Sequence, residues 1–243
     1  VEGSRRTVLL RTATTSERIV AVREATDEVL YLATNLFAVH TRTGVQRGLV
    51  ANADDAAVDS VGRIFVCDED AHRVRTIAPD GTITNFAGNG TDGYGGDGGP
   101  ALAAALSFPD SIVANDDVVF IGDRNNRAIR RVERATGVIT TAVGGPGATQ
   151  PFPSGGAALN ILIPSPLVFG LDGMSRVYFG SSGGTEGMAR LASPGVVEPV
   201  SNGSVAMPNQ TPAIDFRLRT LFKMPFTAGN TALLIPDATS RRL

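Results

Sequence analysis

Two stretches of the chain decide its fold, because they repeat each other almost residue for residue. Residues 54–88 are DDAAVDSVGRIFVCDEDAHRVRTIAPDGTITNFAG, and residues 110–144 are DSIVANDDVVFIGDRNNRAIRRVERATGVITTAVG. Each contains four short runs rich in Val, Ile, Phe and Thr in which apolar and polar residues alternate, with Asp, Asn and Gly between the runs. Alternation with a period of two predicts β-strands, and short polar turns predict antiparallel hairpins. Each stretch is therefore predicted to form a four-stranded antiparallel meander.

Weaker copies of this unit occupy much of the remaining chain. Residues 29–50, 176–200 and 232–243 each carry a strand pattern and the turn that follows it. The residue that ends the second predicted strand recurs at five positions: Thr34, Asp68, Asp123, Ser181 and Asp237. Four-stranded sheets repeated about every 40–50 residues are typical of a β-propeller. An all-β propeller is therefore predicted; a β-sandwich, the alternative, does not predict the repetition.

The two ends of the chain are predicted to complete one sheet together. The sequence stops at SRRL, where a third strand would begin, and residues 1–13 (VEGSRRTVLLRTA) resemble a third and fourth strand. Pairing of the two ends would remove the open edges of the ring. We expect one domain, residues 1–243, with five blades at 17–50, 51–88, 108–144, 165–200 and 221–243 plus 1–16, or six if the propeller continues beyond this sequence.

The predicted connections between blades contain a second repeat. PALAAALSFP (100–109), AALNILIPSP (157–166) and PAIDFRLRTL (212–221) align without gaps. Apolar residues four apart follow the start of each, at Leu102 and Leu106, at Leu159 and Ile163, and at Ile214 and Leu218. This spacing predicts one or two helical turns held in place by an apolar face. The Gly-rich stretches before these segments are predicted to be loops.

Residues 86–144, which begin FAGNGTDGYGGDGGPALAAALSFPDS, resemble the NHL-repeat β-propeller family. The shared features are a strand ending in Ala-Gly, a GDGGPA connection, a first strand led by Pro, an Asp-turn-Arg hairpin and a TGxITT final strand. The resemblance is strong over residues 54–144 and rests on pattern alone elsewhere. The long connections are similar to those of bacterial secreted and surface proteins, which implies a location outside the cytoplasm.

Composition limits the classes of protein to which this chain can belong. It has 243 residues, of which 42% are hydrophobic, and a formal net charge of −2. A chain of this length and apolar content can bury a large core, which argues against intrinsic disorder. A charge near zero argues against a protein that coats nucleic acid or an anionic membrane. We expect no nucleic-acid partner, no membrane span, and a monomeric domain that forms part of a larger chain or stands alone.

Few residues offer catalytic or metal-binding chemistry. Cys67 is the only cysteine, so no intrachain disulfide or CxxC motif exists. The two histidines, His40 and His72, are predicted at outer positions of their blades, where they cannot supply a metal site in the central channel. The position of His72 matches that of the family's histidine and predicts a structural role in a turn. Arginines of the second hairpins, interleaved with acidic residues, predict a solvated ion-paired surface.

Acidic residues recur at the end of the second predicted strand. Asp68, Asp123 and Asp237 occupy this position, and Arg73 and Arg242 follow the first and last of them by five residues. A residue that recurs in each blade indicates a structural role, such as a turn or an Asp–Arg pair, since a catalytic group occurs once. The alternative is that these recurring carboxylates line a cation or ligand site.

The Gly-rich loop at residues 89–99 is predicted to be flexible. Asp92 and Asp97 lack the alternating pattern and bidentate Glu of a calcium loop, so no cofactor is expected, with calcium as the alternative. Tyr94 is an aromatic residue in a loop tip, which favours either a contact with a partner or packing onto its own blade.

The connections between blades and the turns between second and third strands are predicted to emerge on one face. We expect a ligand-binding surface there, formed by Asp68, Glu69, Asp70, Asp92, Tyr94, Asp97, Arg124, Asn125, Asn126, Glu186 and Thr239. The predicted function is a non-enzymatic binding or scaffolding domain for a protein, peptide or glycan. Two alternatives remain: a metal-dependent lyase or lactonase-like hydrolase with its site in the channel, and a rigid spacer.

Overall fold

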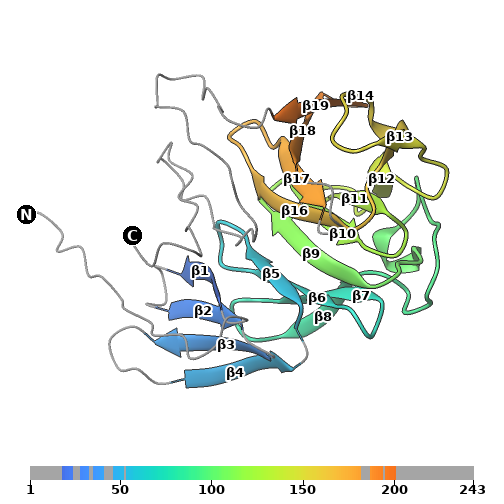
Figure 1. The fold of residues 1–243 in the computed structure, drawn as a ribbon. Coiled ribbons are helices and arrows are strands. Elements are labelled where there is room, and N and C mark those ends of the chain that lie inside the picture. Colours follow the sequence, from blue (N-terminus) through green and yellow to red (C-terminus); the bar gives the residue numbers. More distant parts are fainter. Residues whose placement is uncertain are drawn as a thin grey trace, which may run out of the picture.

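The structure, a computed structural model, describes residues 18–23, 28–32, 35–40, 46–51, 53–181, 187–193 and 195–200. Over these residues the chain is all-β, with four large antiparallel sheets that follow one another in the sequence (Figure 1). The predicted fold class is confirmed. Within the described ranges, no helix has the length and apolar character needed to cross a membrane.

Each large sheet contains a four-stranded meander whose strands pair in chain order. The first sheet consists of β1 (Arg18–Arg23), β2 (Glu28–Leu32), β3 (Asn35–His40) and β4 (Gln46–Ala51). The second consists of β5 (Asp55–Val58), β6 (Ile64–Asp68), β7 (Arg73–Ile77) and β8 (Ile83–Ala87). The third consists of β9 (Pro109–Ala114), β10 (Val118–Asp123), β11 (Ala128–Glu133) and β12 (Ile139–Gly144). The fourth contains β16 (Pro166–Leu171), β17 (Val177–Ser181), β18 (Met188–Ser193) and β19 (Val196–Val200), and the short strand β14 (Gly156–Ala157) pairs with β19 as its fifth strand.

The residues predicted to end second strands do so where the structure describes them. Asp68 ends β6, Asp123 ends β10 and Ser181 ends β17. His40 ends β3, the third strand of its sheet. Thr34, Asp237 and Arg242 lie outside the described residues, as do residues 1–16 and 221–243, which are expected to close the ring.

Three apolar cores lie between successive sheets, and strand alternation divides the side chains among them. In β6, Ile64 and Val66 face the core shared with the first sheet, whereas Phe65 and Cys67 face the core shared with the third. The strand β10 divides its residues between the second and fourth sheets in the same way. Since both faces of these second strands are covered, β6 and β10 are apolar at nearly every position and are buried throughout.

The inner strands β5, β9 and β16 lie next to one another in this order. The Asp55 carboxylate, on β5, accepts a hydrogen bond from the backbone N–H of Ile112 at 2.8 Å. One sheet further on, the Ser111 hydroxyl accepts a hydrogen bond from the N–H of Val168 at 3.2 Å. Asp55 and Ser111 are equivalent in the repeat, so the same side-chain position ties each inner strand to the next. Gly122 makes this approach possible, because a Cβ there would lie 2.1 Å from the Ser111 hydroxyl.

The long connections contain shorter elements than predicted. These elements are η2 (Ala101–Ala103), β13 (Gln150–Pro151), β14 (Gly156–Ala157), η3 (Ala158–Asn160) and β15 (Ile161–Leu162). In the two long connections that the structure describes, the predicted helix is a single 3₁₀ turn, after which the backbone is extended. The third predicted helix, at residues 212–221 with Ile214 and Leu218, lies outside the described residues. Residues four apart therefore do not share a face, and the prediction of an apolar face was wrong at Leu102 and Leu159, which are exposed. Leu106 and Ile163 are buried, as are Ala101 and Ala158.

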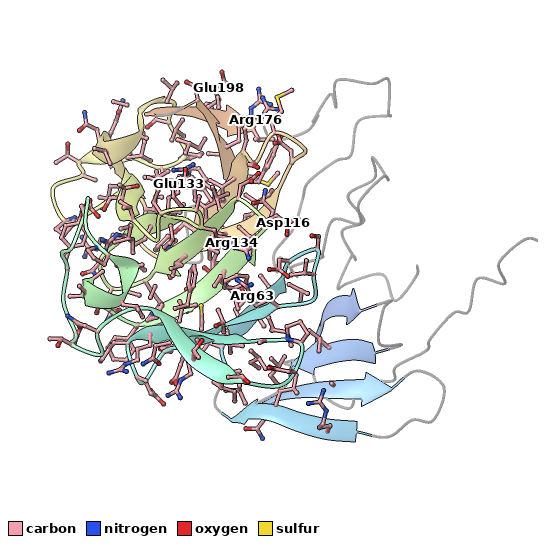
Figure 2. The ribbon with its side chains drawn as sticks, turned by 180° about the vertical axis from the view of Figure 1, so that it is seen from behind. Arg63, Asp116, Glu133, Arg134, Arg176 and Glu198 are labelled. Carbon is pink, nitrogen blue, oxygen red and sulfur yellow. The ribbon has the colours of Figure 1, made fainter. Side chains whose placement is uncertain are left out.

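The turns between first and second strands lie at one end of the sheets, and the turns between second and third strands lie at the other. Figure 2 shows the face that the former turns make. Asp59, Asn115 and Asp172 each accept backbone N–H hydrogen bonds within their own turn. Arg134 ties two sheets together there, since its Nη2 donates to Asp59 Oδ2 at 2.8 Å. Beside Arg134 is a surface pocket of about 280 Å³, also lined by Arg63, Asp116, Asp117, Glu133 and Ala135.

Candidate functional site

Turns between second and third strands lie against the long connections, as expected from the strand order. In the turn after β10, the N–H of Asn125 donates to Ser107 O at 3.2 Å and the Asn126 side chain donates to Gly93 O at 2.7 Å. In the turn after β6, His72 Nδ1 accepts a hydrogen bond from the N–H of Phe108 at 3.3 Å. These turns (69–72 and 124–127) and connections (89–108 and 145–165) are called the loop face below.

Four charged residues gather beside the loop face, at the junction of the second and third sheets. Asp54 precedes β5, Asp110 is on the inner strand β9, and Glu69 and Arg124 come from the two turns. Asp54 Oδ2 accepts the N–H of Glu69 at 3.0 Å. The Arg124 guanidinium pairs with Glu69 and lies 3.7 Å from Asp110 Oδ2. We call Asp54, Glu69, Asp110 and Arg124 the carboxylate cluster.

Burial raises the pKa of two carboxyl groups in this cluster. Loss of solvation raises the pKa of Asp110 to about 7, although Arg124 opposes the shift, while Glu69 and Asp55 add to it. Loss of solvation also raises the pKa of Asp54 to about 6; the hydrogen bond from the Glu69 N–H opposes the shift, and the Glu69 carboxylate adds to it. Asp110 Oδ1 is buried and has no hydrogen-bond partner among the described residues. Near neutral pH, the Asp110 carboxyl can therefore carry a proton, as a general acid must.

The described residues contain no group of three or more His, Cys, Asp and Glu side chains placed to hold a metal ion. His72 lies edge-on to Phe108, with 4.7 Å between the ring centroids, while its Nδ1 accepts the Phe108 N–H. Its contacts are thus structural and join the second sheet to the start of the third. Of His40, the structure describes only the backbone, at the end of β3.

The Gly-rich loop is held against the third sheet by many contacts, which contradicts the prediction that it is flexible. The Tyr94 hydroxyl shares a hydrogen bond of 2.8 Å with Thr141 Oγ1, and the Tyr94 ring lies 5.1 Å from the guanidinium of Arg130. Of the two alternatives for Tyr94, packing onto its own sheet is the one observed. Its ring remains exposed on one side. Gly96, with φ of +87°, is also required, because a Cβ there would lie 2.6 Å from the Ala104 Cα.

Asp97 and Asp123 bind a buried arginine in this structure. Arg130 donates to Asp97 Oδ1 at 2.7 Å and to Asp123 Oδ2 at 3.2 Å. Asp123 also accepts from the Asn126 side chain at 2.9 Å and from the N–H of Ser107 at 2.7 Å. Burial raises the pKa of Asp123, while these donors oppose the shift. The expectation of a solvated arginine surface was wrong at Arg130, which is fully buried.

The recurring Asp–Arg pair uses a different arginine from the one predicted. Asp68 pairs with Arg75 at 2.7 Å, whereas Arg73 donates to Asn89 O at 2.9 Å. Asp123 pairs with Arg130, the equivalent of Arg75 in the repeat. In both hairpins the partner is displaced by two residues from the one directly opposite the aspartate. Long side chains reach such diagonal neighbours on one face of a sheet, so counting along the turn selected the wrong residue.

Part of the predicted binding surface remains free on the loop face. Asp70, Asp92 and Asn125 are exposed, and the structure shows no side-chain hydrogen bond or ion pair for them within the described chain. Asp68, Asp97, Arg124 and Asn126 are engaged in the contacts above. Glu186 and Thr239 lie outside the described residues. Asp70 and Asn125 follow Glu69 and Arg124 of the carboxylate cluster directly in the chain. Sequence reasoning had selected Glu69 and Arg124 but had missed Asp54 and Asp110.

Solved structures of similar shape were found, and the three described here have low sequence identity to this chain. A gluconolactonase from Xanthomonas campestris matches with a TM-score of 0.56 and 13% identity, over 79% of this chain and 64% of that protein. A virginiamycin B lyase from Staphylococcus aureus, bound to quinupristin, matches with a TM-score of 0.51 and 16% identity, over 78% of this chain and 57% of that protein. The chain has the β-propeller fold. A nidogen/laminin complex also matches, with a TM-score of 0.50 and 14% identity, over 72% of this chain and 61% of the other.

These similarities establish the propeller fold alone, since every identity is below 25%. The propeller described here spans less than two thirds of each of the three proteins. No protein-family model matches the sequence, and no curated protein matches it either.

The sequence does contain a sign of the two carboxylates that were missed. Asp54 and Asp110 are equivalent in the repeat, and each lies at the start of an inner strand.

Proposed function

We propose that this propeller is a non-enzymatic binding domain that uses its loop face to engage a protein, peptide or glycan outside the cytoplasm. The supporting observation is that contacts within the chain already hold the loop face in place without a ligand. Its Gly-rich loop is held by Tyr94, Asp97 and the backbone of Gly93, while Asp70, Asp92 and Asn125 are left exposed. Variable turns on a rigid scaffold are where binding surfaces concentrate.

Binding by such a face needs little rearrangement of the protein. Ordering a loop on association costs roughly 0.5–1.5 kcal/mol for each immobilised side chain, and a loop that is already ordered avoids that cost. The exposed groups include carboxylates and an amide, which form hydrogen bonds with sugar hydroxyls, peptide amides or basic side chains. The nidogen/laminin complex provides a precedent for a protein assembly containing a similar fold.

The test is a screen of the purified chain against a glycan array and a peptide array. A triple variant with Asp70→Ala, Asp92→Ala and Asn125→Ala is compared with Met174→Ala, which alters an exposed residue on the opposite face. The proposal expects a ligand whose binding weakens at least tenfold in the triple variant and is unchanged in the control, with both variants folded. A ligand that binds both variants equally, or global unfolding of the triple variant, would contradict it.

A second candidate function, acid–base hydrolysis of a lactone or related ester, is favoured by the carboxylate cluster. A carboxyl group with a pKa near 7 is suited to proton transfer at neutral pH. Activity against a lactone panel that is lost in Asp110→Asn, with the fold intact, would support this function. Thermal unfolding after EDTA treatment, and then with calcium or zinc added, tests for a metal, because a bound ion raises the midpoint of unfolding. Absence of lactone hydrolysis leaves the binding function.

A further inference from the structure

Each long connection that the structure describes places a short segment of chain beside the outer strand of the sheet that follows it. Before the third sheet, residues 98–101 lie antiparallel to the start of β12: Ile139 N–H donates to Gly99 O at 3.0 Å, and Gly98 N–H donates to Ile139 O at 2.8 Å. Before the fourth sheet, β14 lies antiparallel to β19, with Ala157 opposite Val196. Residues 98–101 and 156–158, here called the edge segments, therefore cover the outer strands of two sheets.

The second sheet has no such segment among the described residues. Only residues 52–54 separate β4 from β5, so no chain is available there to reach the outer strand, and β8 is at the edge of its sheet. Ile83, on β8, is equivalent to Ile139 and Val197. Its exposed fraction is 47%, compared with 0% for Ile139 and 1% for Val197. The same position is thus buried where an edge segment is present and exposed where none is described.

The backbone of Ile83 is oriented to accept another strand. Ala78 N–H donates to Thr82 O at 2.9 Å, which makes this a hydrogen-bonded pair of the β7–β8 hairpin. Bonded and non-bonded pairs alternate in an antiparallel ladder, so the next pair, Ile77 and Ile83, directs its N–H and C=O groups away from the hairpin. In the third sheet, the corresponding groups of Ile139 are the ones that bind Gly98 and Gly99.

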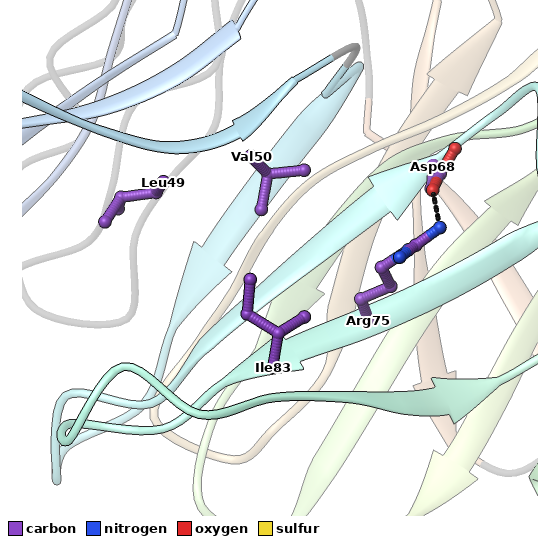
Figure 3. Close-up of a pocket in the computed structure, with 5 residues that line it drawn as sticks. All are labelled: Leu49, Val50, Asp68, Arg75 and Ile83. Atoms are coloured by element: carbon purple, nitrogen blue, oxygen red, sulfur yellow. Dashed lines mark ion pairs between the residues drawn. The ribbon is translucent and has the colours of Figure 1, made fainter.

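Next to this edge is a pocket of about 290 Å³ between the first and second sheets (Figure 3). Leu49 and Val50 of β4 form one side, and Asp68, Arg75 and Ile83 form the other. The residues Asp123, Arg130 and Ile139 are equivalent to the latter three. In the third sheet, the connection covers these residues with Tyr94, Ala104 and Leu106. The pocket is therefore the space that a connection fills one sheet further on.

Charge indicates what kind of segment fits this pocket. Arg130 binds two carboxylates, Asp123 and Asp97, of which the second comes from the connection, and it also stacks on Tyr94. Among the described residues, Arg75 pairs with Asp68 alone, and 38% of its side chain is exposed, compared with 0% for Arg130. An occupant that reproduces the contacts of the third sheet supplies an aromatic ring and one carboxylate to Arg75.

We propose that the outer edge of β8 and the adjoining pocket bind an extended segment of a partner polypeptide, which adds to β8 as an antiparallel fifth strand. The segment carries an aromatic residue followed closely by an acidic one, and small residues where it passes the strand. Backbone hydrogen bonds to Ile83 provide affinity, and the contacts with Arg75 provide specificity, as in other cases of β-strand addition. This site borders the loop face at Asp68 but does not use Asp70, Asp92 or Asn125, the exposed residues of the proposed loop-face surface.

The test uses a labelled peptide with the sequence of residues 91–106, TDGYGGDGGPALAAAL, and the whole chain. We expect saturable binding at peptide concentrations up to about 1 mM, the effective concentration typical of a tethered segment. Binding should weaken at least tenfold for the peptide with Tyr94→Ala and Asp97→Ala. It should also weaken at least tenfold for the protein with Ile83→Pro, since proline is tolerated on an open strand edge but cannot donate the N–H. Ile83→Val, which keeps the N–H, is the matched control and should bind normally.

Arg75→Glu is a second variant, used with a thermal unfolding scan to establish that each protein is folded. It should reduce binding of the acidic peptide at least tenfold. Equal binding by Ile83→Pro and the unaltered protein, or no saturable binding, would overturn the proposal. Hydrogen exchange of the free protein adds a further check: protection of the Ile83 amide equal to that of Ile139 would mean that the chain covers its own edge. Self-association that is lost in Ile83→Pro would mean that a second copy is the occupant. Either result would overturn the assignment to a partner.

Discussion

The second and third sheets come from sequences that align almost residue for residue, yet their equivalent side chains have different surroundings. Arg130 is fully buried and Arg75 is partly exposed, and Ile139 is buried where Ile83 is exposed. The hairpins themselves do not explain the difference. It arises because the connection before the third sheet packs against that sheet, while only three residues precede the second. Burial in a repeat protein thus depends on the connections as much as on the repeats.

The largest expected difference in unfolding free energy is between the alanine variants of Arg130 and Arg75. In Arg130→Ala, the buried Asp123 loses its cationic partner, and such a loss costs about 3–5 kcal/mol. In Arg75→Ala, a partly exposed pair is removed, at a cost of about 0–1 kcal/mol. Chemical denaturation of both variants measures the two values. Equal destabilisation would show that the two arginines do not differ in their surroundings in solution.

Truncation of the equivalent isoleucines is expected to give the next largest difference. Ile139→Ala removes a fully buried side chain and should destabilise the protein by about 2–5 kcal/mol. Ile83→Ala alters a half-exposed side chain, so we expect a loss of less than about 1 kcal/mol. Urea unfolding curves provide both numbers. A large loss for Ile83→Ala would show that the edge of the second sheet is covered in solution.

The equivalent carboxylates Asp54 and Asp110 predict a dependence of stability on pH. The pKa of Asp110 is raised in the folded state, from 3.8 to about 7, so the folded protein binds the proton more tightly. This contribution to stability is fully present below pH 3.8 and is lost as the pH rises toward 7, at up to about 1.4 kcal/mol per pH unit. Asp54 acts in the same direction, but its loss is complete nearer pH 6.

Asp110→Asn should flatten the fall in stability between about pH 6 and 7, where Asp54 contributes least. Denaturation midpoints measured from pH 4 to pH 8 test this expectation. A slope that is the same in the variant would show that Asp110 is not the group that titrates. The Asp54→Asn variant, measured over the same range, distinguishes the two equivalent positions.

The smallest expected loss of stability comes from removing the Tyr94 hydroxyl, which holds the Gly-rich loop. Tyr94→Phe removes the hydrogen bond to Thr141 and keeps the ring over Arg130, so we expect a loss of about 0.5–1.5 kcal/mol. Thr141→Val should cost a similar amount, and the double variant little more than either alone, since both remove the same bond. Additive losses in the double variant would indicate that the hydrogen bond does not form in solution.

Local sequence patterns were sufficient to predict the strands and their antiparallel order. Alternation of apolar residues and short polar turns are properties of neighbours in the chain, and the second, third and fourth sheets follow the predicted repeat. The joint position of turns and connections on one face was also predictable, because it follows from strand order. The helical turns were overestimated, since spacing cannot distinguish a 3₁₀ turn followed by extended chain from a longer helix.

The sequence by itself determined the meander unit, its repetition and the all-β class, because these depend on contacts within and between adjacent strands. The tertiary structure decided which arginine pairs with each recurring aspartate, where Tyr94 packs, and that Asp54 and Asp110 meet Glu69 and Arg124. The reason is physical. Diagonal reach across a hairpin, burial beneath a connection and the loss of solvation that raises a pKa all depend on residues distant in the chain, so no local pattern encodes them.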